Sequence, residues 1–550
     1  MPVAYPGDKQ YSKWIYHNEI DLQMGLAYIF NLIVGTGALT LPAAFSRAGW
    51  LLAACVIVIL AFISYVTVTF VVEAMASANA VLQRKRFQER NHAIQASGIE
   101  DDGHESEDTP LVCQGLVPLS FLALQFFSVC SNSVTEFCLI IDSSDHTRDQ
   151  LVHQCDITEK IEMGQMASLF LSKGGRTLFY LCIIVYLYGD LSIYCAAVAQ
   201  SIADVTCSYI PEDSTCNTTL PETALCWEGL QFTRKDAYRI FLGVFLTVIG
   251  PFAFFNVQKT KYLQILSSLM RWLAYIAKRN VSSFSVMTGY ALREIIMQRN
   301  VQDVVYPPAA SFTGIPALFG ACVYSFMCHH SIPALVTPIA DKSRLAWGFA
   351  LDYIMITTFY LLLALTGVFA FFPNLHDLYT LDFWQPRGCI PRPGIPPPAI
   401  GYFLALFPVF TLSASFPVVA VTLRGNLEAL ILPPKPSPPA PNEADVSRLA
   451  RKLLVPLIAV APPGIVAFAT EDLGTLVGVT GSFAGAGVQY VLPVVLVSAA
   501  RKELLRLNNG EKVPKHRFSS PFSGKAWVAF VLVWSLACIL IVSIRFAEQL

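Results

Sequence analysis

Apolar blocks of about 20 residues recur along the whole chain, and they constrain its fold more than any other feature. A helix needs about 20 apolar residues to cross the hydrocarbon core of a bilayer. Of the 550 residues, 54% are hydrophobic and only 14% are charged. The sequence therefore predicts an all-α polytopic membrane protein whose surroundings are the lipid bilayer. The predicted transmembrane helices, about 11 in number, are residues 22–46, 50–76, 178–207, 238–256, 262–277, 314–339, 347–372, 399–423, 453–470, 473–500 and 527–546.

The charges between these blocks predict how the chain is oriented. Basic residues gather in alternate loops, most densely in the loop 501–526, and cytosolic loops carry an excess of Lys and Arg. We therefore expect a cytosolic N-terminal segment, residues 1–21, and a C-terminus on the outer side. The sequence leaves open whether the plasma membrane or an endolysosomal membrane holds the protein. A net charge of −1 argues against nucleic acid as a partner.

Two segments do not fit a simple succession of spans. Residues 77–176 are expected to form a cytosolic loop, within which the apolar segment 116–141 is non-spanning or half of a hairpin. A single crossing there would move the later basic loops to the outer side. Residues 278–313 are interpreted as an atypical insertion and outer loop after a short fifth span. Both segments could be insertions, and the alternative is an error in the gene model from which the sequence was translated.

The first span contains residues that interrupt a helix, in the stretch "FNLIVGTGALTLP". Gly35, Thr36 and Gly37 lie in its middle, with Asn31 before them and Pro42 after them. Glycine inside a helix costs about 1 kcal/mol relative to alanine. Non-helical backbone at membrane depth is tolerated only where protein buries it or where it lines a cavity. The stretch predicts a binding site, and close packing of helices is the alternative.

The sixth span has a similar interruption, "GACVYSFMCHHSIPALVTP". Ser325, Cys328, His329 and His330 lie together there at mid-membrane, shortly before Pro333. Polar groups at this depth are costly and usually functional. Broken helices in corresponding places of two halves are typical of inverted-repeat transporters with a site at the midplane.

Other spans carry isolated polar residues. Asp190 lies inside the third span, where a carboxylate should be paired, protonated or in contact with water. The two interpretations of Asp190 are that its side chain bonds the backbone of a neighbouring helix and that it has a functional role. Ser415 lies two residues before Pro417 in the eighth span, where bonding within its own helix is the alternative to a functional role. The glycines of residues 478–487 are interpreted as helix-packing residues and not as ligand-binding residues.

The loop 208–236 should face the outer side, where disulfides and glycans form. It contains the sequon Asn217-Thr218-Thr219 between Cys216 and Cys226. We expect Asn217 to be glycosylated and the two cysteines to pair.

These motifs resemble those of the transmembrane protein 104 family, within the amino acid and auxin permease superfamily. The likeness is specific over "NLIVGTGALTLPAAFSRAGW", "YLYGDLSIY", "VYSFMCHHSIP" and "HRFSSPF". It implies a LeuT-like inverted repeat of five plus five helices, with helices one and six broken, and one further C-terminal helix. It also implies that the chain is a secondary transporter of amino acids with eleven transmembrane helices.

The resemblance also implies roles for individual residues. The expected substrate-binding residues belong to the two unwound segments and are Gly35, Thr36, Gly37, Ser325, Phe326 and Cys328. In sodium-coupled relatives an Asn in helix one and a Thr in helix eight serve the ion. Asn31 matches the first of these, whereas Ser415 stands in place of the second. If protons are the coupling ion, Asp190, His329 or His330 should titrate.

The function expected from these observations is alternating-access transport of an amino acid, coupled to protons or sodium. The substrate carboxylate would meet free N–H groups where the second half of helix one begins. No hydrolase motif, metal-ligand spacing or nucleotide loop is present in the sequence, so we expect neither an enzyme nor a cofactor. The alternative is a membrane sensor that binds an amino acid and signals through its cytosolic loop.

Overall fold

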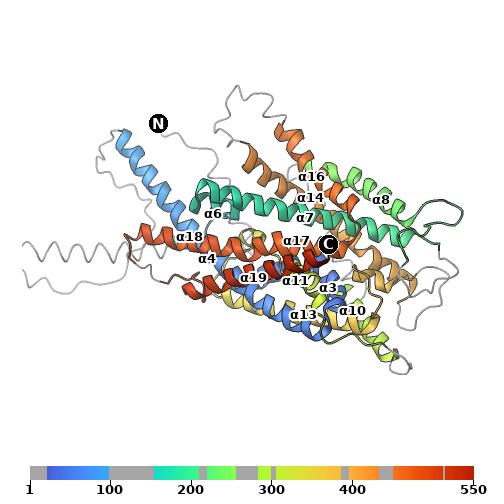
Figure 1. Cartoon of the computed structure of the whole chain (residues 1–550). Coiled ribbons are helices and arrows are strands. Elements are labelled where there is room, and N and C mark those ends of the chain that lie inside the picture. The colour runs from blue at the N-terminus through green and yellow to red at the C-terminus, as the bar shows by residue number, and fades with distance from the viewer. Residues whose placement is uncertain are drawn as a thin grey trace, which may run out of the picture.

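The structure, a computed structural model, describes residues 21–97, 154–209, 220–254, 283–298, 305–385, 396–432, 450–511 and 515–549. Every extended regular element among them is a helix, and the long helices lie alongside one another in one bundle (Figure 1). Within these residues nine helices are long and apolar enough to cross a membrane. The prediction of an all-α polytopic membrane protein is confirmed.

The nine candidate spans coincide with nine of the predicted blocks. They are Trp50–His92, Lys173–Thr206, Arg234–Phe254, Phe312–Val336, Leu345–Phe371, Pro398–Ile431, Lys452–Ala469, Leu473–Leu507 and Lys525–Glu548. The predicted span 22–46 is absent from this set because the helix is broken into two short pieces. The predicted span 262–277 and the apolar segment 116–141 lie outside the described residues. A total of eleven spans therefore stays a prediction.

The first helix breaks where the sequence predicts it. Helix α2 (Leu22–Ile33) ends and α3 (Thr36–Ala48) begins on either side of Val34 and Gly35. Gly35 has φ −128° and ψ −142°, outside the helical region. Its N–H donates to the Ile33 carbonyl at 2.8 Å instead of the carbonyl four residues earlier. The backbone groups around Gly35 are thereby released from the helix.

The sixth helix also breaks in the predicted place. Helix α11 (Ile315–Ser325) is followed by unwound residues 326–328, by the single turn η4 (His329–Ser331) and by α12 (Ile332–Val336). Cys328 has φ −138° and ψ −8°, which is not helical. Both interruptions are therefore confirmed as breaks in the helical backbone.

Helix α4 (Trp50–Ser97) is longer than the predicted span 50–76. The first part of the expected cytosolic loop continues this helix, because side chains beyond residue 76 find partners in the segment before α7. The Asn79 side-chain oxygen accepts from the Glu159 N–H at 3.0 Å. Arg86 and Glu159 form a two-pronged ion pair. The loop 77–176 thus begins after a helical extension and contains the short helix α6 (Met163–Phe170).

The segment 278–313, expected to be an insertion and outer loop, contains the helix α10 (Ser283–Gln298). This helix lies along α13 (Leu345–Phe371). The rings of Phe284 and Phe359 are 5.4 Å apart, and the Gln298 side chain donates to the Ala370 carbonyl at 2.8 Å. The expectation of a loop is wrong for these residues, because an apolar face buried against α13 stabilises a helix there.

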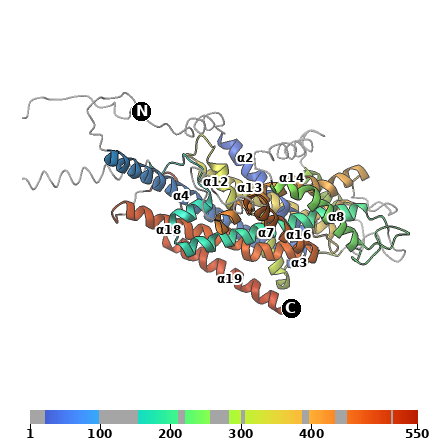
Figure 2. The same cartoon turned by 90° about the horizontal axis from the view of Figure 1, so that it is seen from above.

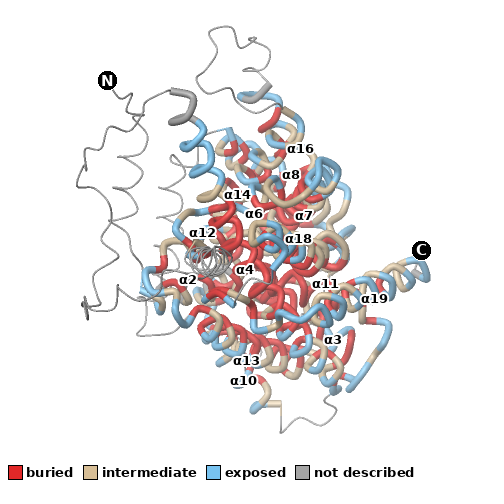
Figure 3. The backbone as a smooth tube through the Cα atoms, turned by 90° about the vertical axis from the view of Figure 1, so that its left-hand side faces the viewer, coloured by how far each residue is buried: buried red, intermediate tan, exposed pale blue. Residues whose placement is uncertain are grey.

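The remaining helices complete the bundle. Buried residues concentrate on its central helices, including α11, α4 and α7, while α8 and α19 expose much of their surface (Figure 3). Helix α19 lies along one edge of the bundle (Figure 2). The bounds are α7 Lys173–Thr206, α8 Arg234–Ile249, η1 Gly250–Phe254, η3 Phe312–Gly314, η5 Tyr379–Phe383, α14 Pro398–Ile431, η6 Ala450–Leu454, α16 Val455–Ala469, α17 Leu473–Thr480, η7 Gly481–Gly485, η8 Gly487–Val491, α18 Leu492–Leu507 and α19 Lys525–Gln549.

The two ends of the bundle differ in chemistry. At one end, α18 ends at Leu507 and α19 begins at Lys525, so the predicted basic loop 501–526 includes the helical end of α18, the connection and the first residues of α19. We call this the basic end. At the opposite end, α7 ends and α8 begins (Figure 1). We call this the disulfide end, for the bridge described below.

Glycines allow α11 to approach α17 and η7 at backbone distance. An added Cβ on Gly481 would lie 2.0 Å from the Gly320 carbonyl oxygen, and one on Gly320 would lie 2.3 Å from the Gly478 carbonyl oxygen. Backbone atoms cannot give way as a flexible side chain can. Gly481 therefore has the packing role that the sequence favoured for the glycines of residues 478–487.

We expect Gly481→Ala to destabilise the purified protein, because the added methyl group must push two helices apart. Overpacking of this kind costs about 1 to 3 kcal/mol, which thermal unfolding in detergent would register as a lowered Tm. Gly243→Ala in α8 is the matched control, since an added Cβ there meets nothing within 4 Å. Equal Tm values for the two variants would contradict the packing role.

Candidate functional site

The two helix breaks lie against each other in the middle of the bundle. An added Cβ on Gly37, in the first turn of α3, would lie 2.5 Å from the Cα and 2.7 Å from the Oγ of Ser325, the last residue of α11. Real Cβ atoms essentially never come this close to backbone, so the contact requires glycine. Two predicted site residues from distant parts of the chain are thus neighbours. In this conformation Gly37 serves packing, and its role toward a substrate stays a prediction.

The polarity of the helix ends gives this junction both donors and acceptors. The first N–H groups of α3, at Thr36 and Gly37, have no intrahelical acceptor, and a helix N-terminus is electropositive. The last carbonyls of α2 and α11, at Ile33 and Ser325, lie at electronegative helix C-termini. N–H donors and carbonyl acceptors are the groups that a carboxylate and an ammonium require.

Tyr360 of α13 joins the two breaks, and sequence reasoning missed it. Its hydroxyl lies 2.8 Å from the Ile33 carbonyl oxygen and 2.9 Å from the Ser325 carbonyl oxygen. The side chain is fully buried. A tyrosine hydroxyl carries one proton and can donate it fully to only one of two acceptors. A tyrosine within an apolar span has no sequence signal that distinguishes it from an ordinary core residue.

Helix α13 also covers the unwound segment of helix six. The ring of Phe326 stacks on that of Tyr353, with centroids 5.9 Å apart and planes at 23°. The Cys328 Sγ lies 3.5 Å from the Tyr353 hydroxyl. Phe326 and Cys328 are both fully buried. The predicted site residues of helix six therefore face α13 in this conformation.

Asp190 of α7 is paired with the residue that precedes Ser325. The Tyr324 hydroxyl donates to its Oδ1 at 2.6 Å, and only 5% of Asp190 is exposed. The alternatives left open by the sequence were a bond to the backbone of a neighbouring helix and a functional role, and the partner found here is a side chain and not backbone. The structure gives it a side-chain partner on helix six, next to the junction of the two breaks.

The two histidines of helix six face different helices. The His329 Nε2 lies 2.9 Å from the Thr67 Oγ1 of α4, which itself donates to carbonyls of its own helix, such as that of Ser64 at 3.0 Å. This network assigns the Nε2 proton to His329 and leaves its buried Nδ1 as an acceptor without a partner among the residues that the structure describes. The ring of His330 instead lies 5.8 Å from that of Tyr186, one turn before Asp190 on α7. Among the described residues no cluster of His, Cys, Asp or Glu is suited to hold a metal ion.

Two further buried polar residues escaped sequence reasoning. Gln489 of η8 is fully buried and donates to the Ser64 hydroxyl of α4. Asp352 of α13 is 3% exposed. Within the described part of the chain, neither the Gln489 Oε1 nor the Asp352 Oδ2 has a hydrogen-bond partner. Asp352 is the one charged residue of α13, and Gln489 is the one amide side chain of the span Leu473–Leu507, which was the available signal. Unpaired buried polar atoms are costly, and π-helical turns such as η8 are frequent at functional sites.

Of the two residues expected to serve a sodium ion, the structure describes the side chain of Ser415 alone. Ser415 donates to the Thr411 carbonyl of its own helix at 3.0 Å, which is the alternative that the sequence offered. Helix α14 lies chiefly along α7. Asn31 lies in α2, and its side chain is outside the described residues. A sodium site at these positions stays a prediction.

A small hollow leads from the disulfide end toward the junction. It is bounded by α3, α11 and α17, and Thr40 and Ala321 lie at its inner side. Thr40 donates to the Gly37 carbonyl and Ser325 donates to the Ala321 carbonyl, so the hollow ends one turn from the two breaks. Its lining residues at the outer side include Arg47 and Asp377, which form an ion pair.

The disulfide of the outer loop differs from the predicted one. Cys226 pairs with Cys207, and the Cα atoms are 4.4 Å apart. The pairing with Cys216 is wrong, because the chain leaving α7 lies directly against Cys226. The Ser208 N–H donates to the Cys226 carbonyl at 2.9 Å, which fixes Cys207 beside it. Cys216 and Asn217 lie outside the described residues, and glycosylation of Asn217 stays a prediction.

This chain is similar to known membrane proteins over nearly its whole length. A family model described as transmembrane amino acid transporter protein matches residues 19–94 and 115–541. Transmembrane protein 104 of Homo sapiens is 43% identical, with 94% of this chain and 95% of the relative covered. Transmembrane protein 104 homologs of Drosophila melanogaster and Caenorhabditis elegans are 41% and 34% identical, over 95% and 93% of this chain and 96% and 94% of the relatives.

We expect Tyr360→Phe to weaken the junction, because it removes the hydroxyl that lies between the Ile33 and Ser325 carbonyls, while the Ile33 carbonyl keeps the Gly35 N–H as a donor. Loss of a donor to buried groups costs about 1 to 3 kcal/mol, to be measured as a change in the free energy of unfolding. Tyr402→Phe in α14 is the matched control, since no hydrogen bond of the Tyr402 hydroxyl is found among the described residues. Unfolding free energies that change equally in both variants would show that the Tyr360 hydroxyl does not join the breaks.

We expect mass spectrometry of the unreduced protein to find a peptide pair linked through Cys207 and Cys226. Cys195, buried in α7 and unpaired, is the internal control and should remain a thiol. A link between Cys216 and Cys226 would contradict the structure and restore the pairing expected from the sequence.

Proposed function

Because this chain belongs to the transmembrane protein 104 family, among the transmembrane amino acid transporter proteins, we propose that it is a secondary transporter that moves amino acids by alternating access. In this proposal the bundle consists of two inverted halves of five helices each, with α19 as the additional C-terminal helix. The membrane surrounds the bundle, and the substrate is a small zwitterion.

The observation that carries the proposal is the contact between the two helix breaks. N–H groups of Thr36 and Gly37 would bind the substrate carboxylate, as helix N-termini bind anions. The carbonyls of Ile33 and Ser325 would accept from its ammonium group, in place of the Tyr360 hydroxyl. Unwound backbone in a membrane helix is costly, and a bound ligand is a physical reason for keeping it.

Transport would require α3 and α11 to separate. The contact of Gly37 with Ser325 leaves no room for a ligand between them in this conformation. The hollow toward the disulfide end, with Arg47 and Asp377 at its mouth, is the route by which a substrate would reach them. We therefore take this conformation as closed, and opening of the Arg47–Asp377 pair as the step that admits substrate.

Protons are the coupling ion that the polar contacts favour. Asp190 accepts a hydrogen bond from Tyr324, next to Ser325. Hydrogen bonds to an ionised group are roughly twice as strong as neutral ones, so protonation of Asp190 would loosen the link between α7 and α11. His330, near Tyr186 on the same helix, is the second candidate. Sodium at Asn31 and Ser415 is the alternative that the same experiment distinguishes.

The orientation proposed for the chain has the basic end in the cytosol. Positive charge favours the cytosolic side, and a disulfide favours an oxidising compartment. The basic loop and the Cys207–Cys226 bridge lie at opposite ends of the bundle, which agrees with both rules. The N-terminus is then cytosolic, and the C-terminus is on the outer or luminal side.

We expect purified protein in liposomes to accumulate radiolabelled amino acids when a pH gradient is imposed. Asp190→Asn should lose the accumulation driven by the gradient and keep exchange of substrate across the membrane, because the substrate groups are untouched. Asp156→Asn, an exposed carboxylate on the segment before α6, is the matched control and should behave like wild type.

Two other outcomes would refute proton coupling or transport itself. Flux that follows sodium and persists in Asp190→Asn would refute proton coupling and favour the sodium alternative. Saturable binding of amino acids without flux under any gradient would refute transport and favour a membrane sensor.

A further inference from the structure

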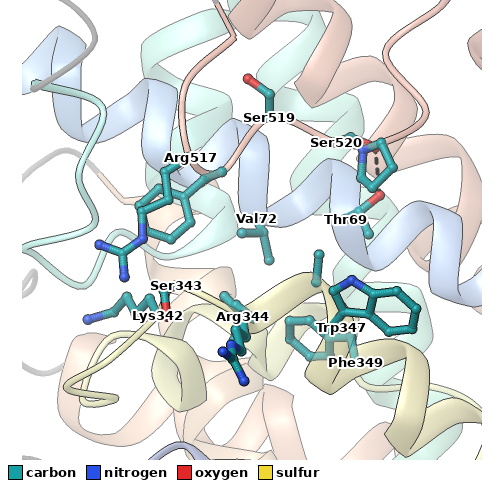
Figure 4. Close-up of a pocket in the computed structure, with 14 residues that line it drawn as sticks. Thr69, Val72, Lys342, Ser343, Arg344, Trp347, Phe349, Arg517, Ser519 and Ser520 are labelled. Carbon is teal, nitrogen blue, oxygen red and sulfur yellow. Dashed lines mark hydrogen bonds between the residues drawn. The ribbon is translucent and has the colours of Figure 1, made fainter.

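A cavity of about 70 Å³ lies at the basic end, away from the junction of the two breaks. Its walls are α4, the segment 342–349 at the start of α13, and residues 517–521 (Figure 4). Lys342, Arg344 and Arg517 line it, and the cationic groups of Lys342 and Arg517 lie on one side of it, with Trp347 on the other (Figure 4). Neither the proposed transport path nor the candidate site uses these residues.

The charges around the cavity favour an anion. Arg517 pairs with Asp341 at 3.0 Å, whereas Arg344 makes no ion pair with any residue that the structure describes. The Ser343 N–H and hydroxyl, together with the charge of Arg517, hold the pKa of Asp341 below its ordinary value, so Asp341 is ionised at neutral pH. Three cations and one carboxylate leave an excess of positive charge.

Backbone groups add to this preference. Helix α13 has 27 residues, and its first residues, Leu345 to Trp347, line the cavity. The N-terminus of a long helix presents N–H groups and a positive dipole end to an anion. Arginine side chains beside such an N-terminus are typical of sites that bind phosphate.

Hydroxyl groups on the opposite wall are held in place. The Ser520 Oγ lies 2.7 Å from the Thr69 Oγ1, and the Ser520 N–H donates to Glu73 at 3.0 Å. Glu73 is itself paired through both oxygens with Arg501 at 2.7 Å. Its charge is therefore balanced, and the wall of the cavity that carries Ser520 does not repel an anion.

Aromatic side chains place the cavity at the boundary between lipid and water. The ring of Phe522 lies 5.9 Å from that of Tyr65 and 4.8 Å from that of Trp527. The Tyr65 hydroxyl donates to the carbonyl of Ala346, which lines the cavity, at 3.3 Å. Trp347 is 80% exposed. Tyr and Trp are enriched at the level of the lipid headgroups.

We propose that this cavity binds the phosphate group of an anionic lipid headgroup in the leaflet at the basic end. Arg344, Arg517 and the N-terminus of α13 hold the phosphate, and Lys342 neutralises its second charge. Asp341 competes with it for Arg517. Basic pockets between transmembrane helices on the cytosolic side are known to bind phosphorylated headgroups. The site is independent of the proposed transport.

Native mass spectrometry of the full chain, taken from nanodiscs of phosphatidylcholine with a minor share of phosphatidic acid, tests this proposal. Wild type should retain phosphatidic acid at a ratio of one. Each basic residue that lies against the anionic headgroup contributes about fivefold in affinity, so Arg344→Gln with Arg517→Gln should lower retention roughly 25-fold. Arg506→Gln, an exposed arginine at the same end outside the cavity, is the matched control and should retain lipid as wild type does.

Asp341→Asn should raise retention, because it frees Arg517, and a gain of binding does not arise from misfolding. Equal retention by wild type and the double variant, or no gain in Asp341→Asn, would overturn the site. Inorganic phosphate is the second probe. If millimolar phosphate alone displaces the lipid, the ligand is a soluble anion and the lipid assignment is overturned.

Discussion

Backbone groups that leave a helix inside a bilayer must find partners within the protein, since each unsatisfied group costs several kcal/mol. This chain meets that requirement by placing its two breaks against each other. Glycine at position 37 allows the contact, and the Tyr360 hydroxyl lies within hydrogen-bonding distance of the last carbonyl of each first half. The position of α13, and with it the burial of Phe326 and Cys328, follows from this arrangement.

The polar side chains near the sixth helix divide into two groups around this junction. His329 connects the break to Thr67 of α4, and Gln489 connects η8 to Ser64 of the same helix. Asp190 and Tyr324 connect α11 to α7. A change in one group therefore moves helix six relative to a different neighbour from a change in the other. Such a division would let proton binding and substrate binding act on one helix without sharing a residue.

Charge pairs hold this conformation at both ends of the bundle. At the disulfide end, Arg47 of α3 pairs with Asp377, whose Oδ2 also accepts from the Gly474 N–H of α17 at 3.3 Å. At the basic end, Glu73 of α4 pairs with Arg501 of α18. The Arg47 side chain is 46% exposed and that of Arg501 only 24%. Breaking the more buried pair costs more, so the Arg47–Asp377 pair is the easier of these two to open.

The sequence by itself determined the class of protein, most of the spans and the places of both breaks. These properties are local, because hydrophobic length, glycine and clustered polar residues act within one segment. Only the tertiary structure decided which residues join the breaks and which cysteine pairs with Cys226. Tyr360 resembles an ordinary residue of an apolar span, Gln489 is recognisably polar but its partner on α4 is not evident from the sequence, and α10 is a helix because it packs on α13. Their roles depend on which helices are neighbours, and the spacing of residues along one chain does not contain that information.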